Sequence, residues 1–294
     1  MEFYANLHSH CTHSDGKYTP EEIVKIAKDE GYKAFAITDH DTATSWPHLK
    51  AVCEKEGLDY IYGVEFTANS PLLKSGYFHM VAFNFDPEYP EMKDYLEKLS
   101  LNETFQTKYC FDKGVAEGKL LGITWDEVLA YNGDITWLCN EHLFRAMKAK
   151  GLVTDKDYNQ FFSAFFGPRR YEVELPYDFL QVDELIDLVH RAGGIILVAH
   201  PSGQFHLIDQ LLEMGLDGLE VWHADLTEEE RALAFKIGTE KKLFMSGGSD
   251  HSGLCGGMYD TYEDPTTSPH YIEPMSCGVP YEYFVELKNG KVNR

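Results

Sequence analysis

Residues 3–16 read FYANLHSHCTHSDG, and this stretch decides the fold expected for the chain. The apolar run from Phe3 to Leu7 predicts a strand, which leads into a loop rich in His, Ser and Asp. His8 and His10 alternate at the end of that strand, so their side chains can lie on the same side of it. Imidazole groups are typical metal ligands, and the stretch therefore predicts a strand that ends at a metal site.

The same order of strand, turn and helix continues along the chain. Residues 19–32, TPEEIVKIAKDEGY, predict a helix with Thr19 as N-cap, Glu22 in a capping box and Gly31 at its end. Further helices are predicted over 46–56, 182–192, 208–214 and 228–241, and strands over 33–38, 59–66, 79–85, 194–200, 218–223 and 243–251. Strands that alternate with helices and end on polar residues predict a parallel α/β barrel or sheet.

Residues 86–178 interrupt this rhythm. They carry helical periodicity and contain no clear buried strand, which predicts a helical insertion. The expected organisation is a core domain formed by residues 1–85 and 179–294, which holds the metal site, and an insertion over 86–178 that caps the substrate.

The composition limits the partners. The chain has 294 residues, with 26 Lys and Arg against 48 Asp and Glu, and a formal net charge of −22. Such an acidic surface repels long nucleic acids and anionic membranes, so we expect a small substrate. No stretch is apolar over the ~18 residues of a membrane span. The six cysteines are scattered without a Cys-x-x-Cys pair, and a reduced, cytoplasmic enzyme is the expectation.

Ligand-type residues occur at or near the predicted ends of several strands. Besides His8 and His10, the set comprises Asp15, His40, Asp41, Glu65, His79, His200, Asp250 and His251. A single histidine is usually not a ligand, and this reading is preferred for the histidines without such placement: His13, His48, His190, His206 and His270. Chance rarely places so many ligand types at successive strand ends. Imidazole and carboxylate ligands together suit zinc, iron or manganese, and a carboxylate such as Glu65 can bridge two ions. The set therefore predicts a centre of such ions.

These residues resemble the PHP (polymerase and histidinol phosphatase) family of metal-dependent phosphoesterases. The matching motifs are HSHCTHSDG (8–16), TDHDT (38–42), GVEFT (63–67), His79, AHPSG (199–203), GLEVW (218–222) and GGSDHSG (247–253). They span nearly the whole chain apart from the insertion. The resemblance implies a distorted (β/α)7 barrel with a helical insertion, and two or three divalent metal ions (Zn, Fe or Mn) at the carboxyl ends of the strands.

Position by position, the resemblance also implies which residues hold the ions. The first ion would be held by His8, His10, Glu65 and Asp250. Glu65 would bridge to a second ion, held also by His79 and His200.

A third ion would take Asp15, His40 and a histidine of the last motif. There the chain departs from the family, because the usual histidine position is Ser252. We expect His251, one residue earlier, to replace it.

The SDG form of the first motif and the DHDT form of the second are similar to the branch of the family that acts on nucleotides and small phosphomonoesters. That branch carries a helical insertion in which an Arg-x-His pair is usual. The matching pair here is Asn140 and His142. His142 is therefore one substrate-binding candidate, with Arg145, or Arg169 and Arg170, as the basic partner. A solvated helix face and a basic loop are the alternatives for these arginines.

The function implied is hydrolysis of a small phosphomonoester, foremost a nucleotide, by attack of a metal-bound hydroxide, with inorganic phosphate as product. The expected catalytic residues are His8, His10, Glu65, Asp250 and His223. His223 would contact the phosphate or protonate the leaving group. Asp41 would orient His40, and Glu220 would brace the strand ends.

Three other functions are compatible with the same residues. One is a histidinol-phosphate phosphatase, and another is an exonuclease that acts on short oligonucleotides. The third is a metal-binding module without catalysis. The sequence leaves the oligomeric state open.

Overall fold

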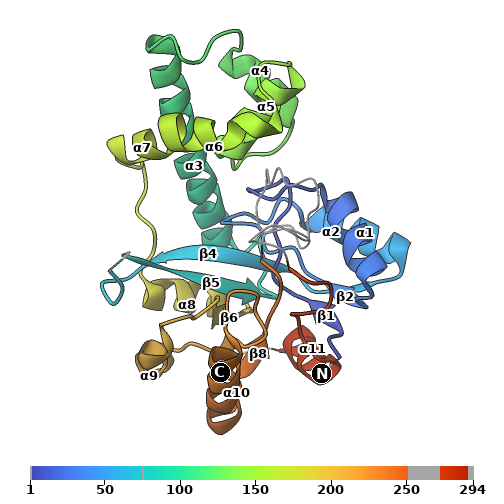
Figure 1. Cartoon of the computed structure of the whole chain (residues 1–294). Coiled ribbons are helices and arrows are strands. Elements are labelled where there is room, and N and C mark those ends of the chain that lie inside the picture. Colours follow the sequence, from blue (N-terminus) through green and yellow to red (C-terminus); the bar gives the residue numbers. More distant parts are fainter. Residues whose placement is uncertain (1, 75, 251–271, 291–294) are drawn as a thin grey trace.

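The computed structural model describes residues 2–74, 76–250 and 272–290. Within them, short strands form two sheets, with strand orders β1-β2-β3 and β4-β5-β6-β7-β8 (Figure 1). The strands are β1 (Ala5–Asn6), β2 (Ala34–Phe35), β3 (Asp59–Tyr60), β4 (Gly63–Asn69), β5 (Tyr77–Phe83), β6 (Ile195–Val198), β7 (Gly218–Glu220) and β8 (Phe244–Ser246). The fold is therefore a mixed α/β fold.

The pairing is parallel except at β5. β1, β2 and β3 are parallel, as are β6, β7 and β8. β5 runs antiparallel to both β4 and β6, so the expectation of parallel strands throughout is wrong at this strand. The reason is that only residues 70–76 separate β4 from β5, and a connection without a crossover helix can join only antiparallel neighbours.

The two sheets meet at both edges without merging into one closed ladder of the described strands. At one edge, the N–H of Leu7 donates to the carbonyl of Gly247 at 3.1 Å, and the N–H of Asp250 donates to that of His8 at 2.9 Å. At the other edge, the N–H of Glu65 donates to the carbonyl of Thr38 at 3.2 Å. The strand predicted over 59–66 is accordingly divided, with β3 in the first sheet and β4 in the second.

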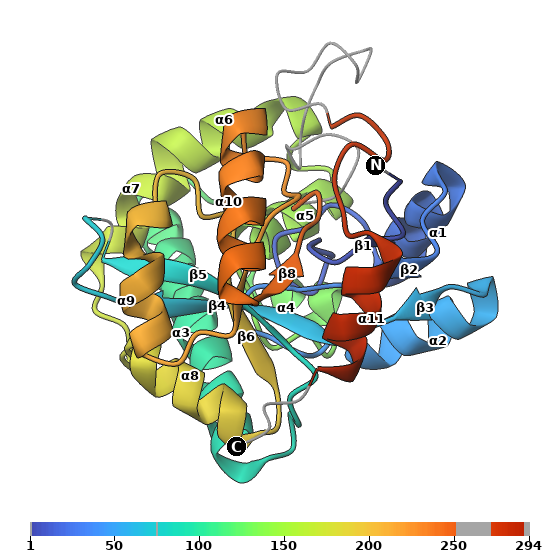
Figure 2. The same ribbon diagram turned by 90° about the horizontal axis from the view of Figure 1, so that it is seen from below.

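Helices surround the sheets (Figures 1 and 2). They are α1 (Pro20–Glu30), α2 (Trp46–Glu56), α8 (Val182–Arg191), the 3-10 turn η4 (Phe205–Leu207), α9 (Ile208–Glu213), α10 (Glu228–Lys241) and α11 (Tyr281–Asn289). The predicted capping box of α1 is confirmed, because the Thr19 side chain accepts from the N–H of Glu22 and Gly31 ends the helix at φ 112°. The predicted bounds of α2 and α10 are confirmed as well.

A second group of helices projects from the sheets on α3 (Pro90–Ala116), as Figure 1 shows. It contains α4 (Trp125–Asn132), α5 (Asn140–Ala149), η1 (Asp155–Asp157), α6 (Tyr158–Phe161), the π-helical turn η2 (Phe162–Phe166), α7 (Gly167–Arg169) and η3 (Arg170–Glu172). Met92 and Tyr95 of α3 pack into the main core, whereas Cys110 and Phe111 pack into a separate apolar cluster with the other helices. The long helix therefore joins two cores, and the domain limits at 86–178 stay a prediction.

Within the described residues, no helix combines the length and the apolar composition that crossing a bilayer requires.

We expect a cavity made in one core to destabilise that core more than the other. Phe144 is fully buried in the cluster of the projecting helices. Phe144→Ala should lower the free energy of unfolding by about 3–5 kcal/mol because it leaves a large void. Amide hydrogen exchange measured by mass spectrometry should accelerate over 110–166 more than over β4 to β8. Phe284→Ala, which opens the main core, should show the reverse pattern, and equal acceleration of both regions in both variants would contradict separate cores.

Candidate metal centre

Glu65 lies at the centre of the predicted ligand set. Its side chain, on β4, is 1% exposed, and both carboxylate oxygens face histidine rings. Oxygen Oε2 lies 3.3 Å from His8 Nε2, 3.2 Å from His10 Nε2 and 3.1 Å from His40 Nδ1, and oxygen Oε1 lies 3.1 Å from His79 Nδ1 and 3.0 Å from His200 Nε2. Each oxygen therefore serves a different group of imidazoles, which is the arrangement of a bridging carboxylate.

The backbone reaches this arrangement through unusual conformations at strand ends. Asp41, His200 and Asp250 follow β2, β6 and β8 with φ values of 53°, 28° and 56°, in the left-handed region that costs residues other than glycine free energy. Gly248 allows the end of β8 to approach β1, because a Cβ atom there would lie 2.3 Å from the backbone nitrogen of His8. The close approach brings Asp250 within 3.2 Å of His10 Nε2.

Glu220 fixes the orientation of the His8 ring. Its carboxylate oxygens lie 2.9 and 3.1 Å from His8 Nδ1, so this nitrogen donates its proton to Glu220. In the neutral ring, Nε2 then carries a lone pair that points at the carboxylates of Glu65 and Asp250, at 3.3 and 3.9 Å. Neither His8 Nε2 nor Glu65 Oε2 makes a hydrogen bond within the described residues, although both atoms are buried.

A cation between these atoms would satisfy them, since a buried lone pair facing a buried carboxylate is otherwise costly. The shifted pKa values of His8 and Glu65 agree with a cation at this position. Burial opposes charge on His8, but Glu220, Glu65 and Asp250 together raise its pKa well above the usual value. Burial alone would raise the pKa of Glu65, yet His8 and the other imidazoles hold it well below its usual range. The donor set therefore fits divalent metal ions.

Within the described residues, five groups of potential ligand atoms have all their atoms within 4.8 Å of one another. Three consist only of predicted ligand candidates: His8, His10, Glu65 and Asp250; His40, Glu65 and His79; and His10, Asp15 and His40. The first of these holds the four residues predicted for the first ion. The other two groups are His8, Glu220 and His223, and His223, Asp225 and Asp250. His200 shares Glu65 Oε1 with His79. The structure thus brings together eight of the nine ligand candidates, while His251 and the neighbouring Ser252 lie outside the described residues.

His223 is fully buried beside the ligand set. The backbone N–H of Asp225 donates to its Nδ1 at 3.1 Å, so the proton of the neutral ring is on Nε2. Burial lowers the pKa of His223, which favours this neutral form. Nε2 lies 3.6 Å from Asp250 Oδ2 and 3.7 Å from Glu220 Oε2, too far for a hydrogen bond. His223 therefore aims a buried N–H donor at the metal centre.

Two of the four substrate-binding candidates on the projecting helices contact the loop that follows β1. His142 Nε2 lies 3.0 Å from the Thr12 carbonyl, and Arg145 donates to the carbonyls of Gly16 at 2.6 Å and Ser14 at 3.2 Å. Their donors are therefore occupied by backbone of the chain itself.

Arg169 and Arg170 lie farther along the same helices. Arg169 pairs with Glu117 at 2.6 Å. Burial opposes charge on Arg170, but Glu103 raises its pKa, and its Nε is buried without a hydrogen-bond partner in the described chain. Of the four candidates, Arg170 is the one with a buried polar atom that lacks a hydrogen-bond partner among the described residues.

Sequence reasoning missed several neighbours of the site. Trp137 stacks on His40 with ring centroids 6.3 Å apart and an interplanar angle of 25°. Burial, with Glu141 among the other causes, raises the pKa of Glu103 to about 7. Nothing local marks these residues, because they reach the site only through the fold of the projecting helices. The Asp41 carboxylate, expected at His40, instead accepts from the N–H of Thr67 at 2.8 Å.

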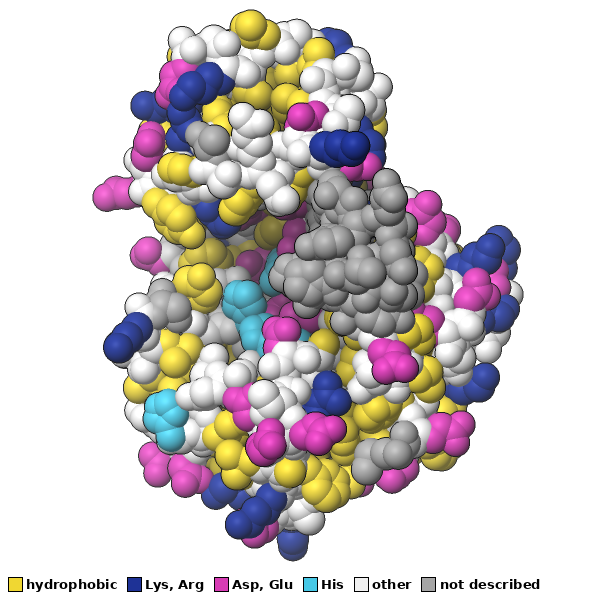
Figure 3. All heavy atoms as spheres, viewed as in Figure 1, with side chains coloured by type: hydrophobic (Ala, Val, Ile, Leu, Met, Phe, Trp, Pro, Cys, Tyr) yellow, Lys and Arg dark blue, Asp and Glu magenta, His cyan; other side chains and the backbone are white. Residues whose placement is uncertain are grey.

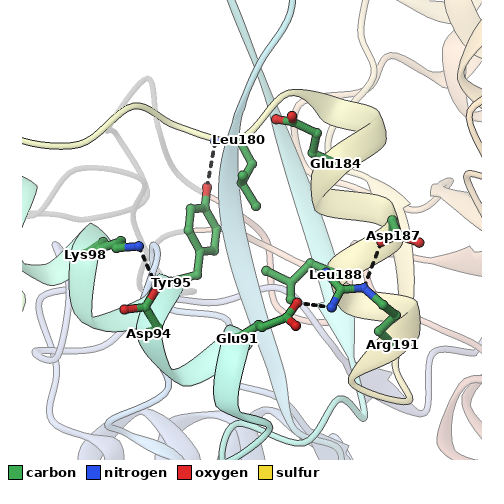
Figure 4. Close-up of a pocket in the computed structure, with 9 residues that line it drawn as sticks. All are labelled: Glu91, Asp94, Tyr95, Lys98, Leu180, Glu184, Asp187, Leu188 and Arg191. Atoms are coloured by element: carbon green, nitrogen blue, oxygen red, sulfur yellow. Dashed lines mark hydrogen bonds and ion pairs between the residues drawn. The ribbon is translucent and has the colours of Figure 1, made fainter.

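Figure 3 shows a hollow between the projecting helices and the sheets, with histidine and acidic side chains on its floor. A separate surface groove of about 360 Å³ lies between α3 and α8 (Figure 4). Its charged groups pair with one another, for example Lys98 with Asp94 at 2.6 Å and Arg191 with Asp187 at 2.8 Å. None of the nine residues that line this groove belongs to the metal centre.

Known proteins resemble this chain over most of its length. A 5'-3' exoribonuclease of Haemophilus influenzae is 28% identical over 85% of this chain and 90% of its own. A 3',5'-nucleoside bisphosphate phosphatase of Chromobacterium violaceum is 22% identical over 86% of this chain and 88% of its own. The crystal structure of a putative metal-dependent phosphoesterase from Bifidobacterium adolescentis is 26% identical and superposes with a TM-score of 0.73, over 96% of this chain and 94% of the other.

The PHP domain matches residues 6–219, well over half of the chain and most of the ligand candidates. The fold, the buried donor set and this match make the chain an enzyme that hydrolyses phosphoester bonds. The protein belongs to the PHP domain family.

Proposed function

We propose that the protein hydrolyses small phosphomonoesters of the nucleotide type and that divalent ions held by the eight ligand candidates support the reaction. The observation that carries this proposal is the division of the Glu65 carboxylate between two groups of imidazoles. A bridging carboxylate can hold two cations at a short separation, and such a pair would stabilise the attacking and leaving oxygens of an in-line displacement at phosphorus. The distorted (β/α)7 barrel that the resemblance implies stays part of this proposal.

Ions bound here would lower the pKa of a water molecule and balance the charge that develops on the phosphate. The residues of the chain do the rest. Glu220 holds the His8 ring in the tautomer that turns Nε2 toward the centre, and it also accepts from the backbone N–H of His200 at 2.8 Å. The eight candidates are held on strands or on the segments that follow them, which fixes their geometry before substrate arrives.

His223 suits a phosphate contact better than a proton donor to the leaving group. These two roles were both open from the sequence. A neutral imidazole is a weak acid, because losing the Nε2 proton would leave an anion in a buried, acidic environment. The same N–H can donate a hydrogen bond to a phosphate oxygen without proton transfer. We therefore assign His223 to phosphate binding.

The charges around the site favour a small substrate. Glu103 and Glu141 come from the projecting helices toward Asp15, and burial raises the pKa of both glutamates. Arg145 and Arg169 are occupied by other partners. A polyanion would meet the net charge of −22 along its whole length, whereas a mononucleotide reaches the ions with little contact beyond them. The exoribonuclease among the relatives keeps a short oligonucleotide as the second candidate substrate.

Metal binding should release protons even above neutral pH. The Glu65 hydrogen bond and charge overcome burial and raise the pKa of His200 to about 9, so the metal-free ring holds a proton at pH 8, where an ordinary imidazole is neutral. An ion requires the neutral ring, so binding must displace that proton. Calorimetric titration with Mn²⁺ at pH 8 in buffers of different ionisation enthalpy should detect this release. His200→Gln should release fewer protons, and an unchanged count would contradict the assignment of His200.

Glu65→Gln tests the proposed reaction. The amide keeps the size of the side chain but cannot bridge two cations as an anion, so turnover should fall by more than the ~10- to 100-fold that outer residues of a metal site contribute. The exposed Glu240→Gln is the matched control. Initial rates should be compared for nucleoside monophosphates, a nucleoside 3',5'-bisphosphate, histidinol phosphate and a short 5'-phosphorylated oligoribonucleotide.

The relative rates on these substrates distinguish the candidate functions. Faster cleavage of the oligoribonucleotide than of the mononucleotides would replace the proposal with an exonuclease. Preference for histidinol phosphate would move the substrate to that class. Absence of any turnover by the Mn²⁺-loaded protein would leave a metal-binding module.

His223→Gln separates the two roles of this histidine. Loss of one preorganised donor to the phosphate should lower kcat/KM by about 10²–10³-fold, equally for good and poor leaving groups. Phosphate monoesters of p-nitrophenol and of an aliphatic alcohol provide the comparison. A loss confined to the aliphatic ester would show that His223 protonates the leaving group.

A further inference from the structure

The loop that carries Asp15 is held from two sides. On the sheet side, the buried Asp39 carboxylate accepts from the backbone N–H of Cys11 at 2.8 Å, the Cys11 thiol at 3.0 Å and the Ser14 hydroxyl at 2.7 Å. The loop also folds back on itself, because a Cβ atom on Gly16 would lie 2.3 Å from the His10 carbonyl. These contacts fix the start of the loop and leave the carbonyl groups of Thr12, Ser14 and Gly16 to helix α5.

Helix α5 occupies those carbonyls. His142 Nδ1 accepts from the N–H of Cys139 at 3.1 Å, so Nε2 carries the ring proton and donates it to the Thr12 carbonyl at 3.0 Å. Arg145 spans the next two alternate carbonyls, Ser14 and Gly16, at 3.2 and 2.6 Å. Three alternate carbonyls of one loop are thus satisfied by two side chains one turn apart on one helix.

The geometry of these contacts is specific. The planar guanidinium group offers two donors in a fixed fork, which holds two acceptors at a set separation. The carbonyls it holds flank Asp15, whose carboxylate oxygens lie 3.7 Å from His10 Nδ1 and 3.8 Å from His40 Nε2. A change in the position of α5 therefore shifts the backbone on both sides of Asp15.

We propose that His142 and Arg145 are positioning residues: by holding the loop 12–16 they place Asp15 in the ligand group of His10 and His40, so that the docking of the helical insertion controls ion binding at that corner of the centre. This inference rests on the proposed metal-dependent function. It replaces the direct substrate contact expected for His142 and Arg145. It also makes the insertion part of the metal centre, in addition to any contact it makes with substrate.

Coupling of this kind is reciprocal. If docking of α5 strengthens ion binding at Asp15, then an ion bound there stabilises the docked helix by the same free energy. The effect is measurable without substrate, using Mn²⁺ alone. Hydrogen exchange in the wild-type protein should slow over residues 11–17 and 139–146 together as the weakest class of Mn²⁺ site fills. Protection of the loop without the helix would overturn the inference.

Arg145→Met removes the fork and keeps most of the aliphatic stem. In equilibrium dialysis with Mn²⁺, one class of site should weaken by about 10- to 100-fold, the effect typical of an outer residue in a metal site, while the other sites keep their affinity. Arg145→Lys should recover only part of the loss, because one ammonium group cannot reproduce the fork. Lys148→Ala, an exposed residue of the same helix, should bind Mn²⁺ as the wild type does.

A double-mutant cycle with Asp15→Ala makes the test specific. If Arg145 acts through Asp15, Arg145→Met should cause no further loss of Mn²⁺ affinity when Asp15 is already absent. Independent losses that add, equal weakening of every site, or unchanged affinity would each overturn the inference. If Arg145→Met fails to fold, the Arg145→Lys cycle and the wild-type exchange experiment decide the question.

Binding and turnover separate the two proposals. Mn²⁺ binding that depends on Arg145, in a protein that hydrolyses no phosphoester, would leave the positioning role intact and remove the proposed function. Phosphomonoester hydrolysis with Mn²⁺ affinity unchanged by Arg145→Met would do the opposite.

Discussion

The burial of one carboxylate governs the architecture. Glu65 is 1% exposed, and a buried carboxylate without partners carries a desolvation cost of several kcal/mol or more. Imidazoles from β1, β5 and the ends of β2 and β6 supply the partners, so these strands must end around a single point. The lengths of the strands, the meeting of the two sheets and the glycine contact between β8 and β1 are consistent with that requirement.

The same requirement explains where the backbone is strained. His200 and Asp250 leave their strands in the left-handed conformation, at a cost of order 1–3 kcal/mol each. Contacts around them hold the strained turns: the N–H of His200 donates to Glu220, and the N–H of Asp250 donates to the carbonyl of His8. Glu220 thus stabilises the centre through its contacts with the His8 ring and the backbone of His200.

The sequence was informative wherever the deciding interaction is local. The helix at 20–30 was predictable from Thr19, Glu22 and Gly31, because its caps lie within the helix and its flanks. The ligand candidates were predictable because they lie near the ends of strand-like runs or, like Asp15, in the loop that follows one. The direction of β5 depends on the short connection from β4, and the pattern of residues within a strand does not encode its direction. The contacts of Arg145 depended on partners 129 and 131 residues away, which no local pattern encodes.

Charge connects these features. The centre gathers carboxylates from the sheets and from the loop after β1, so the field in the hollow attracts cations and repels a free phosphate. An anionic substrate becomes favourable there only after cations reverse the local sign. Arg145 donates its hydrogen bonds to the loop backbone. Bound ions and the His223 N–H would therefore supply the positive charge and the hydrogen bond that this arginine does not offer to a phosphate. On the proposed role of Arg145, fixing the Asp15 loop would therefore affect phosphate binding as well, through the ions.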